Sequence, residues 1–160
     1  MIGYSDEAGT RHVPLLPLKN VVLLPRSIRP IIVGRDLSIK AVEEALKHDK
    51  TLFVTAQKEV DTENPTANDV FHWGTRSTIL QVMRMPKGAL KILVEGISRS
   101  RMLSSKERDG FIEVEYEDVL TENLESSVDI EALWRHLNSL YSSYCRLNDK
   151  APDDLLLNAK

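Results

Sequence analysis

The sequence predicts a mainly β (α+β) protein, with a barrel-like β domain that carries one amphipathic surface helix and is followed by the beginning of a helical bundle. Two observations support this prediction. Apolar runs interrupted by prolines, and then alternating strand patterns, extend from Val13 to Leu120, and a long amphipathic helix pattern begins at Asp129. With 160 residues, 42% of them hydrophobic and 28% charged, the chain suits one globular domain with an appendage.

The stretch from Val13 to Val33 reads VPLLPLKNVVLLPRSIRPIIV, two apolar runs divided by Lys19 and Asn20. Its prolines stand at Pro14, Pro17, Pro25 and Pro30. Each proline lacks a backbone N–H and fixes φ, so these runs can form strands only where the missing donor faces solvent, a bulge or a sheet edge. We therefore expect this stretch at the rim of a β-sheet.

A surface helix and a short strand come next. From Leu37 to His48 the apolar residues recur near helical spacing and the opposite face is charged, which predicts an amphipathic helix. Thr51 to Ala56 is mostly apolar and predicts a short strand. The polar stretch from Glu59 to Asp69, which contains Pro65, predicts a loop.

Three more strands are expected before Leu120. Arg76 to Met85 and Leu90 to Ile97 are separated by Pro-Lys-Gly-Ala at 86–89, which is typical of a hairpin turn. A second turn at 108–110 leads to Phe111 to Leu120, where acidic residues alternate with apolar ones. Such alternation indicates a strand with one face buried and the other in water.

The remainder of the chain predicts helices. Thr121 to Val128 is polar and reads as a linker, and apolar side chains then recur at steps of three and four residues to Leu147. These side chains are Ile130, Leu133, Trp134, Leu137, Leu140, Tyr141, Tyr144 and Leu147. A further helix is expected from Pro152, and its apolar run suggests that the chain was cut from a longer one. The expected division is a flexible tail (1–12), the barrel (13–120), the linker (121–128) and a truncated helical subdomain (129–160).

Charge is distributed unevenly along the chain. The net charge is −3, but residues 13–103 carry 14 Lys and Arg against 9 Asp and Glu, whereas residues 104–160 carry 6 against 13. This asymmetry suggests two units with different surfaces, or subunits that meet head to tail; ordinary solvated faces remain an equal alternative. The single cysteine and the lack of an apolar run near the ~20 residues of a membrane span favour a cytoplasmic location without a membrane partner.

The sequence contains no residue pattern that catalysis or cofactor binding would require. It has no Gly-rich loop ending in Gly-Lys-Ser or Gly-Lys-Thr, and no histidine has a second ligand at a zinc spacing. We interpret His12, His48, His72 and His136 as surface or packing residues, and Cys145 as a structural thiol. The expected catalytic, cofactor-binding and metal residues are therefore none.

The stretch PLLPLKNVVLLPRSIRPIIVGRDLSI resembles the opening of the amino-terminal domain of the Lon protease family. The resemblance continues in family order through Val54–Lys58, Gly74–Thr75, Ile79–Gln81 and Leu93–Gly96, and it covers nearly the whole chain from Val13. One departure is Asn20, where the family usually has Asp. Each motif alone is weak, but their order and spacing together are specific.

This resemblance implies a PUA-like β-barrel followed by a helical bundle. It also implies a non-catalytic domain that recognises substrates and supports assembly in an ATP-dependent serine protease for protein quality control. In that family, ATP, magnesium and the Ser-Lys proteolytic site belong to domains absent from this chain. The implied partners are unfolded, damaged or degron-bearing proteins, the remainder of the Lon chain, and other subunits of a cytoplasmic homohexamer.

Apolar residues near turns are the best candidates for substrate contacts, because methionine and other adaptable apolar side chains suit diverse unfolded chains. The candidates are Leu23, Leu24, Pro25, Ile28, Met83, Met85 and Pro86. The competing interpretation is that Leu23, Leu24 and Met83 simply fill the barrel. For Met85 and Pro86, which lie beside a turn, the sequence favours exposure.

Two alternative functions remain open at this point. One is a free-standing Lon-domain adaptor, which a longer coding sequence after Lys160 would exclude. The other is an RNA-binding barrel, suggested by Arg99 and Arg101 on one strand and by the cations around the 86–89 turn. Only 6% of the residues are aromatic and none is interleaved with these cations, so nucleic acid is not the partner we expect.

Overall fold

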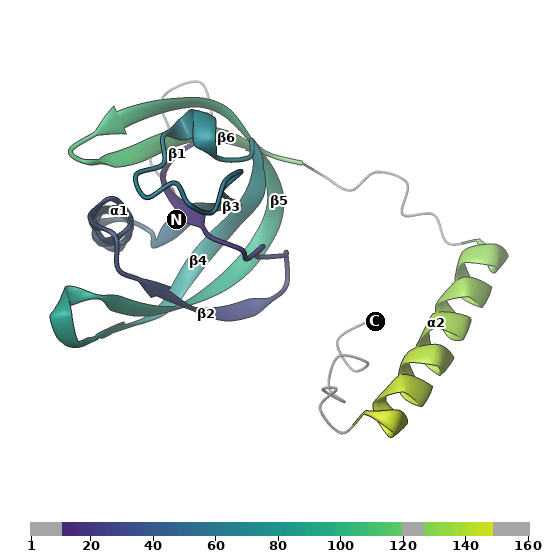
Figure 1. The fold of residues 1–160 in the computed structure, drawn as a ribbon. Helices are drawn as coiled ribbons and strands as arrows, with labels where there is room; N and C mark the ends of the chain where they lie inside the picture. The colour runs from purple at the N-terminus through teal and green to yellow at the C-terminus, as the bar shows by residue number, and fades with distance from the viewer. Residues whose placement is uncertain (1–10, 120–126, 149–160) are drawn as a thin grey trace. The chain divides into compact units, whose positions relative to one another are not determined.

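The computed structural model describes residues 11–119 and 127–148, and Figure 1 shows its elements. The strands are β1 (Arg11–Leu18), β2 (Ile28–Val33), β3 (Thr51–Ala56), β4 (Trp73–Arg84), β5 (Leu90–Arg108) and β6 (Phe111–Asp118). The helices are α1 (Asp36–Lys47) and α2 (Val128–Leu147), with short 3₁₀ turns at Ala67–Asp69 and Pro86–Gly88. The mainly β prediction is confirmed.

The strands close into a barrel. Their order is β2-β5-β4-β3-β1-β6, and an additional β5–β6 pairing joins the last strand back to β5. The ring therefore consists of β5, β4, β3, β1 and β6, while β2 is an extra strand on the first half of β5. β5 can serve three neighbours because it is 19 residues long: residues 90–95 pair with β2, and residues 100–108 pair with β6. Figure 1 shows β5 curving around the domain.

The prolines stand where a strand has one unpaired edge. β1 pairs with β6 from Arg11 to Pro14 and with β3 from Leu15 to Leu18, so each half of β1 has one of these two partners. Pro14 lies in the first half, and Pro17 in the second. Pro30 lies on β2, whose neighbour in the sheet is β5. The prediction that this stretch lies at the rim of the sheet holds for β2. β1 is instead one of the strands that form the closed ring, and it tolerates prolines because it changes partner midway.

The barrel holds two clusters of buried apolar side chains. One contains residues of β1, β2, β3, β4 and β5 together with Val42 and Ala45 of α1. The other surrounds Phe53 and includes Val114 and Tyr116 of β6. α1 thus lies on the barrel with its apolar stripe inward, as the sequence pattern predicts.

Several element boundaries differ from the expected ones. β3 spans the predicted residues, and α1 begins and ends one residue earlier than predicted. β5 continues eleven residues past Ile97, because pairing with β6 maintains the strand through a polar stretch that has no apolar alternation. β1 begins at Arg11, inside the predicted tail. The rest of that tail, most of the predicted linker and the helix expected from Pro152 lie outside the described residues.

The chain divides into two compact units, 1–120 and 121–160. In the second, α2 begins after Ser127, whose Oγ accepts a hydrogen bond from the backbone N–H of Ile130 at 3.2 Å. None of the residues of α2 is buried, and the exposed fractions of its stripe reach 69% at Leu133 and 89% at Leu147. Neither described helix combines the length and apolar character that crossing a bilayer requires.

Candidate functional site

The segment 19–27, between β1 and β2, presents apolar side chains from a fixed backbone; we call it the apolar loop. Its neighbouring leucines differ sharply, because Leu23 is 3% exposed and belongs to the core, whereas Leu24 is 62% exposed. Val21, Val22 and Pro25 are also exposed. The buried leucine anchors the loop, and the other apolar residues face solvent.

Hydrogen bonds hold the apolar loop against β4 and β5. Thr75 Oγ donates to the Leu23 carbonyl at 2.6 Å, and the Arg26 N–H donates to the Gly96 carbonyl at 2.8 Å. The Gly96 N–H donates in turn to the Ser27 carbonyl at 2.9 Å. These bonds satisfy backbone groups that would otherwise lack partners away from strand pairing.

Gly96 is required for this close approach. A Cβ at that position would lie 2.3 Å from the carbonyl oxygen of Leu24, a distance that a real side chain cannot adopt. At the bends of the loop, Asn20 and Arg26 have positive φ angles of 54° and 61°. The loop is therefore shaped by specific contacts.

A second apolar surface lies on the outward side of β2, β5 and β4; we call it the outer sheet face. Residues opposite one another in a sheet share a face, and the register aligns Ile32, Lys91 and Met83 in one row. Ile32 is 67% exposed and Met83 53%. Ile28, at 53% exposure, lies further along β2 with the same side-chain orientation as Ile32. The outer sheet face thus exposes Ile32 and Met83 on either side of Lys91.

The predicted candidates divide between these surfaces, with one correction. Leu24 and Pro25 are in the apolar loop, and Ile28 and Met83 are on the outer sheet face. In the β4–β5 turn, Pro86 is exposed, and Met85 is half-buried with its N–H bonded to the Ala89 carbonyl at 2.8 Å. Leu23 is not on the surface, because it fills the barrel; the prediction that it contacts substrate is therefore wrong.

Sequence reasoning missed exposed residues beside those candidates. Val22 is 64% exposed and Ile32 67% exposed, slightly more than the candidate Leu24 at 62%. The signal for Ile32 was present: Ile28, Pro30 and Ile32 alternate along β2, so they share a face. No comparable pattern distinguishes Val22, because the loop that exposes it has no regular period.

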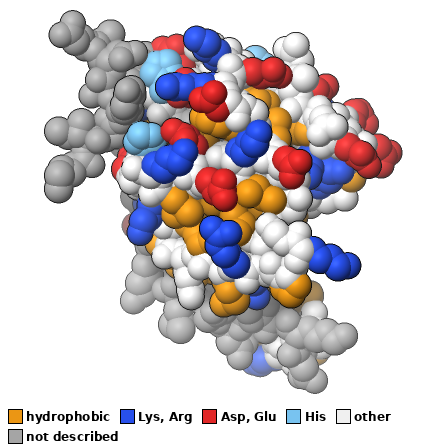
Figure 2. All heavy atoms as spheres, turned by 90° about the vertical axis from the view of Figure 1, so that its left-hand side faces the viewer, with side chains coloured by type: hydrophobic (Ala, Val, Ile, Leu, Met, Phe, Trp, Pro, Cys, Tyr) orange, Lys and Arg blue, Asp and Glu red, His pale blue; other side chains and the backbone are white. Residues whose placement is uncertain are grey.

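Figure 2 looks at the side of the barrel where α1 and the ends of two hairpins lie. Hydrophobic side chains gather there in patches separated by Lys, Arg, Asp and Glu side chains. Such a mixture of apolar and charged side chains is compatible with contacts to many different partners.

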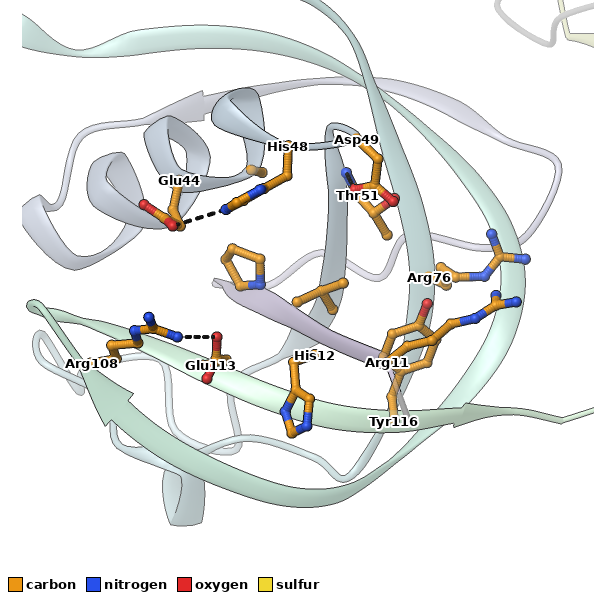
Figure 3. Close-up of a pocket in the computed structure, with 13 residues that line it drawn as sticks. Arg11, His12, Glu44, His48, Asp49, Thr51, Arg76, Arg108, Glu113 and Tyr116 are labelled. Atoms are coloured by element: carbon orange, nitrogen blue, oxygen red, sulfur yellow. Dashed lines mark hydrogen bonds and ion pairs between the residues drawn. The ribbon is translucent and has the colours of Figure 1, made fainter. Parts of the chain in front are cut away.

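A polar pocket of about 420 Å³ lies between the C-terminal end of α1 and strands β1 and β6 (Figure 3). Glu44 of α1 and His48, which follows that helix, approach to 3.2 Å, and Arg108 donates to Glu113 at 3.1 Å. Asp49 accepts the Thr51 N–H at 3.1 Å. The hydrogen bond from Lys47, opposed in part by burial, keeps the pKa of Glu44 below its ordinary value. The acidic groups of this pocket are thus already engaged within the protein.

One wall of the pocket continues into a polar network around Asp118. Its carboxylate accepts hydrogen bonds from Ser98 and Ser100 at 2.7 Å each and from Arg76 Nε at 2.9 Å. Burial alone would raise the pKa of Asp118, but these hydrogen bonds outweigh burial, so its pKa lies below the ordinary value. The network links the end of β6 to β4 and β5 and thus stabilises the barrel.

The described residues give no basis for a metal centre. Within them, no three His, Cys, Asp or Glu side chains come together in a group that could hold a metal ion. The four histidines named from the sequence are dispersed: His12 is on β1, His48 follows α1, His72 precedes β4, and His136 is on α2. Cys145 is half-buried on α2.

Comparison with known proteins identifies the family of this chain. Residues 12–160 match the family model described as the ATP-dependent protease La (LON) substrate-binding domain. The chain belongs to this family. The matched family model describes a substrate-binding domain, so membership assigns this chain a binding role within the family.

Curated Lon proteases are similar over nearly all of this chain. The Lon protease of Endomicrobium trichonymphae is 40% identical over 144 residues, which are 89% of this chain and 18% of the relative. The Lon protease of Escherichia coli strain K12 is 36% identical over 145 residues, or 91% of this chain and 18% of the relative. The chain therefore spans less than a fifth of the length of these relatives.

Solved Lon amino-terminal domains share the fold. The N-terminal domain of a Mycobacterium avium complex Lon protease superposes with a TM-score of 0.67 at 23% identity, covering 85% of this chain and 68% of that one. The Lon N-terminal domain protein from Xanthomonas campestris gives 0.60 at 19% identity, covering 80% and 71%. At these identities the likeness establishes the architecture of the Lon domain.

Proposed function

We propose that this chain captures unfolded or degron-bearing polypeptides for a Lon protease, through the apolar loop and the outer sheet face. The observation that carries the proposal is the contrast within the loop: Leu23 is locked in the core, so the adjacent Leu24 is held 62% exposed on a hydrogen-bonded backbone. A rigid exposed leucine loses little conformational entropy when it binds, which favours recognition.

Each subunit binds the substrate weakly, and several subunits together bind it tightly. The two apolar surfaces are shallow, and charged residues such as Lys91 interrupt them, so one domain holds an apolar segment only briefly. In a homohexamer, several copies engage different segments of the same unfolded chain, and the effective local concentration raises overall affinity about 10²- to 10⁴-fold.

The remaining roles belong to a longer protein. In this proposal, ATP and magnesium act in a separate ATPase domain, a Ser-Lys endopeptidase domain cuts the substrate, and the protein works in the cytoplasm. The exposed stripe of α2 packs against the remainder of the Lon chain. Burying a leucine such as Leu133, which is 69% exposed, contributes about 1.5–3 kcal/mol to such packing.

An NMR titration tests the capture surface. Proton–nitrogen spectra of the ¹⁵N-labelled chain are recorded with a chemically unfolded protein and, separately, with the same protein folded. We expect the unfolded form alone to shift the amides of the apolar loop and of residues 83–87. A lack of response to both forms would overturn the proposal and leave the domain a role in assembly.

A matched pair of substitutions refines this test. Leu24→Asp places a charge in the apolar loop and should abolish the amide shifts that the unfolded protein causes in that loop. The control, Leu103→Asp, changes a leucine that is 47% exposed on the part of β5 that pairs with β6. The proposal expects the second variant to bind as the unmodified chain does. Equal loss of binding in both variants would show that general hydrophobicity, and not this surface, is responsible.

The structure offers no support for RNA binding. Arg99 lies 4.4 Å from the ring centroid of Trp73, so that this exposed ring is occupied by a cation of the same chain. Arg101 forms an ion pair with Glu117 at 2.6 Å. Two of the cations that suggested an RNA surface are therefore already engaged.

A further inference from the structure

An apolar groove of about 590 Å³ lies beside β2 and borders both surfaces described so far, because Ile32 of the outer sheet face and Lys19 and Val21 of the apolar loop are among its lining residues. It is lined by the last residues of β1, by Pro30–Val33 of β2, and by Gly34, Arg35 and Ser38 at the start of α1. In the sheet order, β2 lies at the end and has β5 as its neighbour. The groove thus borders the edge of β2 that faces away from β5.

The backbone of β2 presents hydrogen-bonding groups to that edge. The Gly96 N–H donates to the Ser27 carbonyl, and in an antiparallel pair every second residue bonds to the partner. The N–H and C=O groups of the intervening residues Ile28, Pro30 and Ile32 therefore point away from β5. Of these three residues, Pro30 and Ile32 line the groove. They offer an extended segment two C=O acceptors and, because proline has no N–H, one N–H donor.

The end of the groove at α1 favours a negative charge. Lys19 and Arg35 line the groove, and none of its lining residues is acidic. The first N–H groups of an α-helix carry a partial positive charge, and α1 has twelve residues with Arg35 as its N-cap. Burial lowers the pKa of Arg35, which indicates a guanidinium held partly out of water.

Ser38 gives an independent sign of a ligand. It lines the groove and is 3% exposed, and its Oγ lacks a hydrogen-bond partner among the described residues. A buried hydroxyl without a partner is uncommon and costly, so an unpaired one beside a cation points to a group that arrives on binding. Arg35 itself is oriented by its hydrogen bonds to Gln57 Oε1 and, at 2.7 Å, to the Pro17 carbonyl.

We propose that this groove binds the carboxyl-terminal end of an apolar polypeptide. About four residues lie extended beside Pro30–Val33, their apolar side chains in the groove, and the terminal carboxylate meets Arg35, Ser38 and the start of α1. The inference rests on the proposed capture of unfolded proteins and assigns one class of substrate to it: chains whose exposed ends are apolar.

Fluorescence anisotropy tests the inference with one labelled decapeptide that ends in Leu-Val-Leu, prepared as the free acid and as the amide. We expect the acid to bind at least about tenfold more tightly, because charge-assisted hydrogen bonds to the carboxylate are lost in the amide. Equal affinities would overturn the inference and indicate that internal apolar segments occupy the groove.

Two variants locate the effect. Ser38→Ala removes a hydroxyl with no partner among the described residues and should keep the fold, which a thermal melt checks. It should reduce the preference for the free-acid peptide about threefold or more. The affinity for the peptide amide should not change. Ser105→Ala, on exposed β5, should leave the preference unchanged. An undiminished preference in Ser38→Ala would overturn the assignment to this groove.

The same samples separate this inference from the proposed function. Binding of a chemically unfolded protein, measured in parallel, reports on capture in general. If the unfolded protein binds while the acid and the amide bind equally, only the carboxyl-terminal site is wrong. If neither the unfolded protein nor the peptide binds, the proposed function fails as well.

Discussion

Leu23 and Leu24 are chemically identical neighbours with opposite environments, so they separate stability from binding. Leu23→Ala deletes core volume and should lower the free energy of unfolding by about 2–5 kcal/mol, because Leu23 is 3% exposed. Leu24→Ala should change it by less than about 0.5 kcal/mol but weaken binding of unfolded protein. Denaturant unfolding and anisotropy measure the two effects; a destabilised Leu24→Ala would contradict the loop geometry.

Asp118 predicts a pH-dependent contribution to stability. Its pKa in the folded protein lies below the unfolded value of about 3.9, so the stabilisation is fully present above that value and is lost as pH falls through the folded pKa. Asp118→Asn should cost about 1–3 kcal/mol at pH 7, towards the lower end because the carboxylate is partly exposed, and the difference should shrink below about pH 4. Urea unfolding at pH 7 and pH 3 measures it.

A difference between the unmodified chain and Asp118→Asn that stayed constant over this pH range would mean that the carboxylate charge is not what holds the network. Lys106→Gln is a suitable control, because Lys106 is exposed on β5 and takes no part in the hydrogen bonds that Asp118 accepts from Ser98, Ser100 and Arg76.

Individual residues were the least predictable level from sequence. The inward side chains of β6, such as Val114 and Tyr116, followed from alternation. The burial of Leu23 did not, because the loop that carries it is held by Thr75, which donates to the Leu23 carbonyl, and by Gly96, which lies against Leu24; both are about fifty to seventy residues away in the chain. A pattern read along the sequence holds no information about such distant hydrogen bonds.

At the scale of elements, Gly96 links the apolar loop to β5. Gly96→Ala would place a Cβ 2.3 Å from the Leu24 carbonyl, so the loop must move. We expect a loss of about 1–3 kcal/mol and changed amide shifts throughout residues 19–27, measured by thermal unfolding and NMR. Gly34→Ala is the control, because a Cβ there meets nothing within 4 Å. Unchanged loop shifts in Gly96→Ala would show that the loop does not depend on this contact.

Elements with strong local periodicity were predicted well. β3 and α1 agree with the sequence within one residue because their apolar spacing is local. β5 was expected to end at Ile97, and its second half was missed because Ser98 to Arg108 is polar and is held in place by pairing with β6. Likewise, the partner change within β1 is a property of the closed sheet and not of its own residues.

At the scale of the whole molecule, the barrel contains both of its described core clusters, whose members lie between Val13 and Tyr116. We therefore expect residues 1–120 alone to fold, with a thermal midpoint within about 3 °C of the full chain, which is less than the shift that 1 kcal/mol produces in a domain of this size. Circular dichroism melts measure it. A truncated chain that is unfolded at 25 °C would show that residues 121–160 are required.

The pairing of β1 with β6 also sets an order of events during synthesis. Pro14 pairs opposite Glu113, so the first half of β1 leaves the ribosome about 100 residues before its partner. At about 5–20 residues per second, that edge waits roughly 5 to 20 seconds unpaired. Pro14, which the closed barrel tolerates in β1, deprives this waiting half of β1 of one donor, and a strand edge that lacks a donor is a poorer template for aggregation. We therefore expect Pro14 to limit aggregation of the nascent chain before β6 has been synthesised.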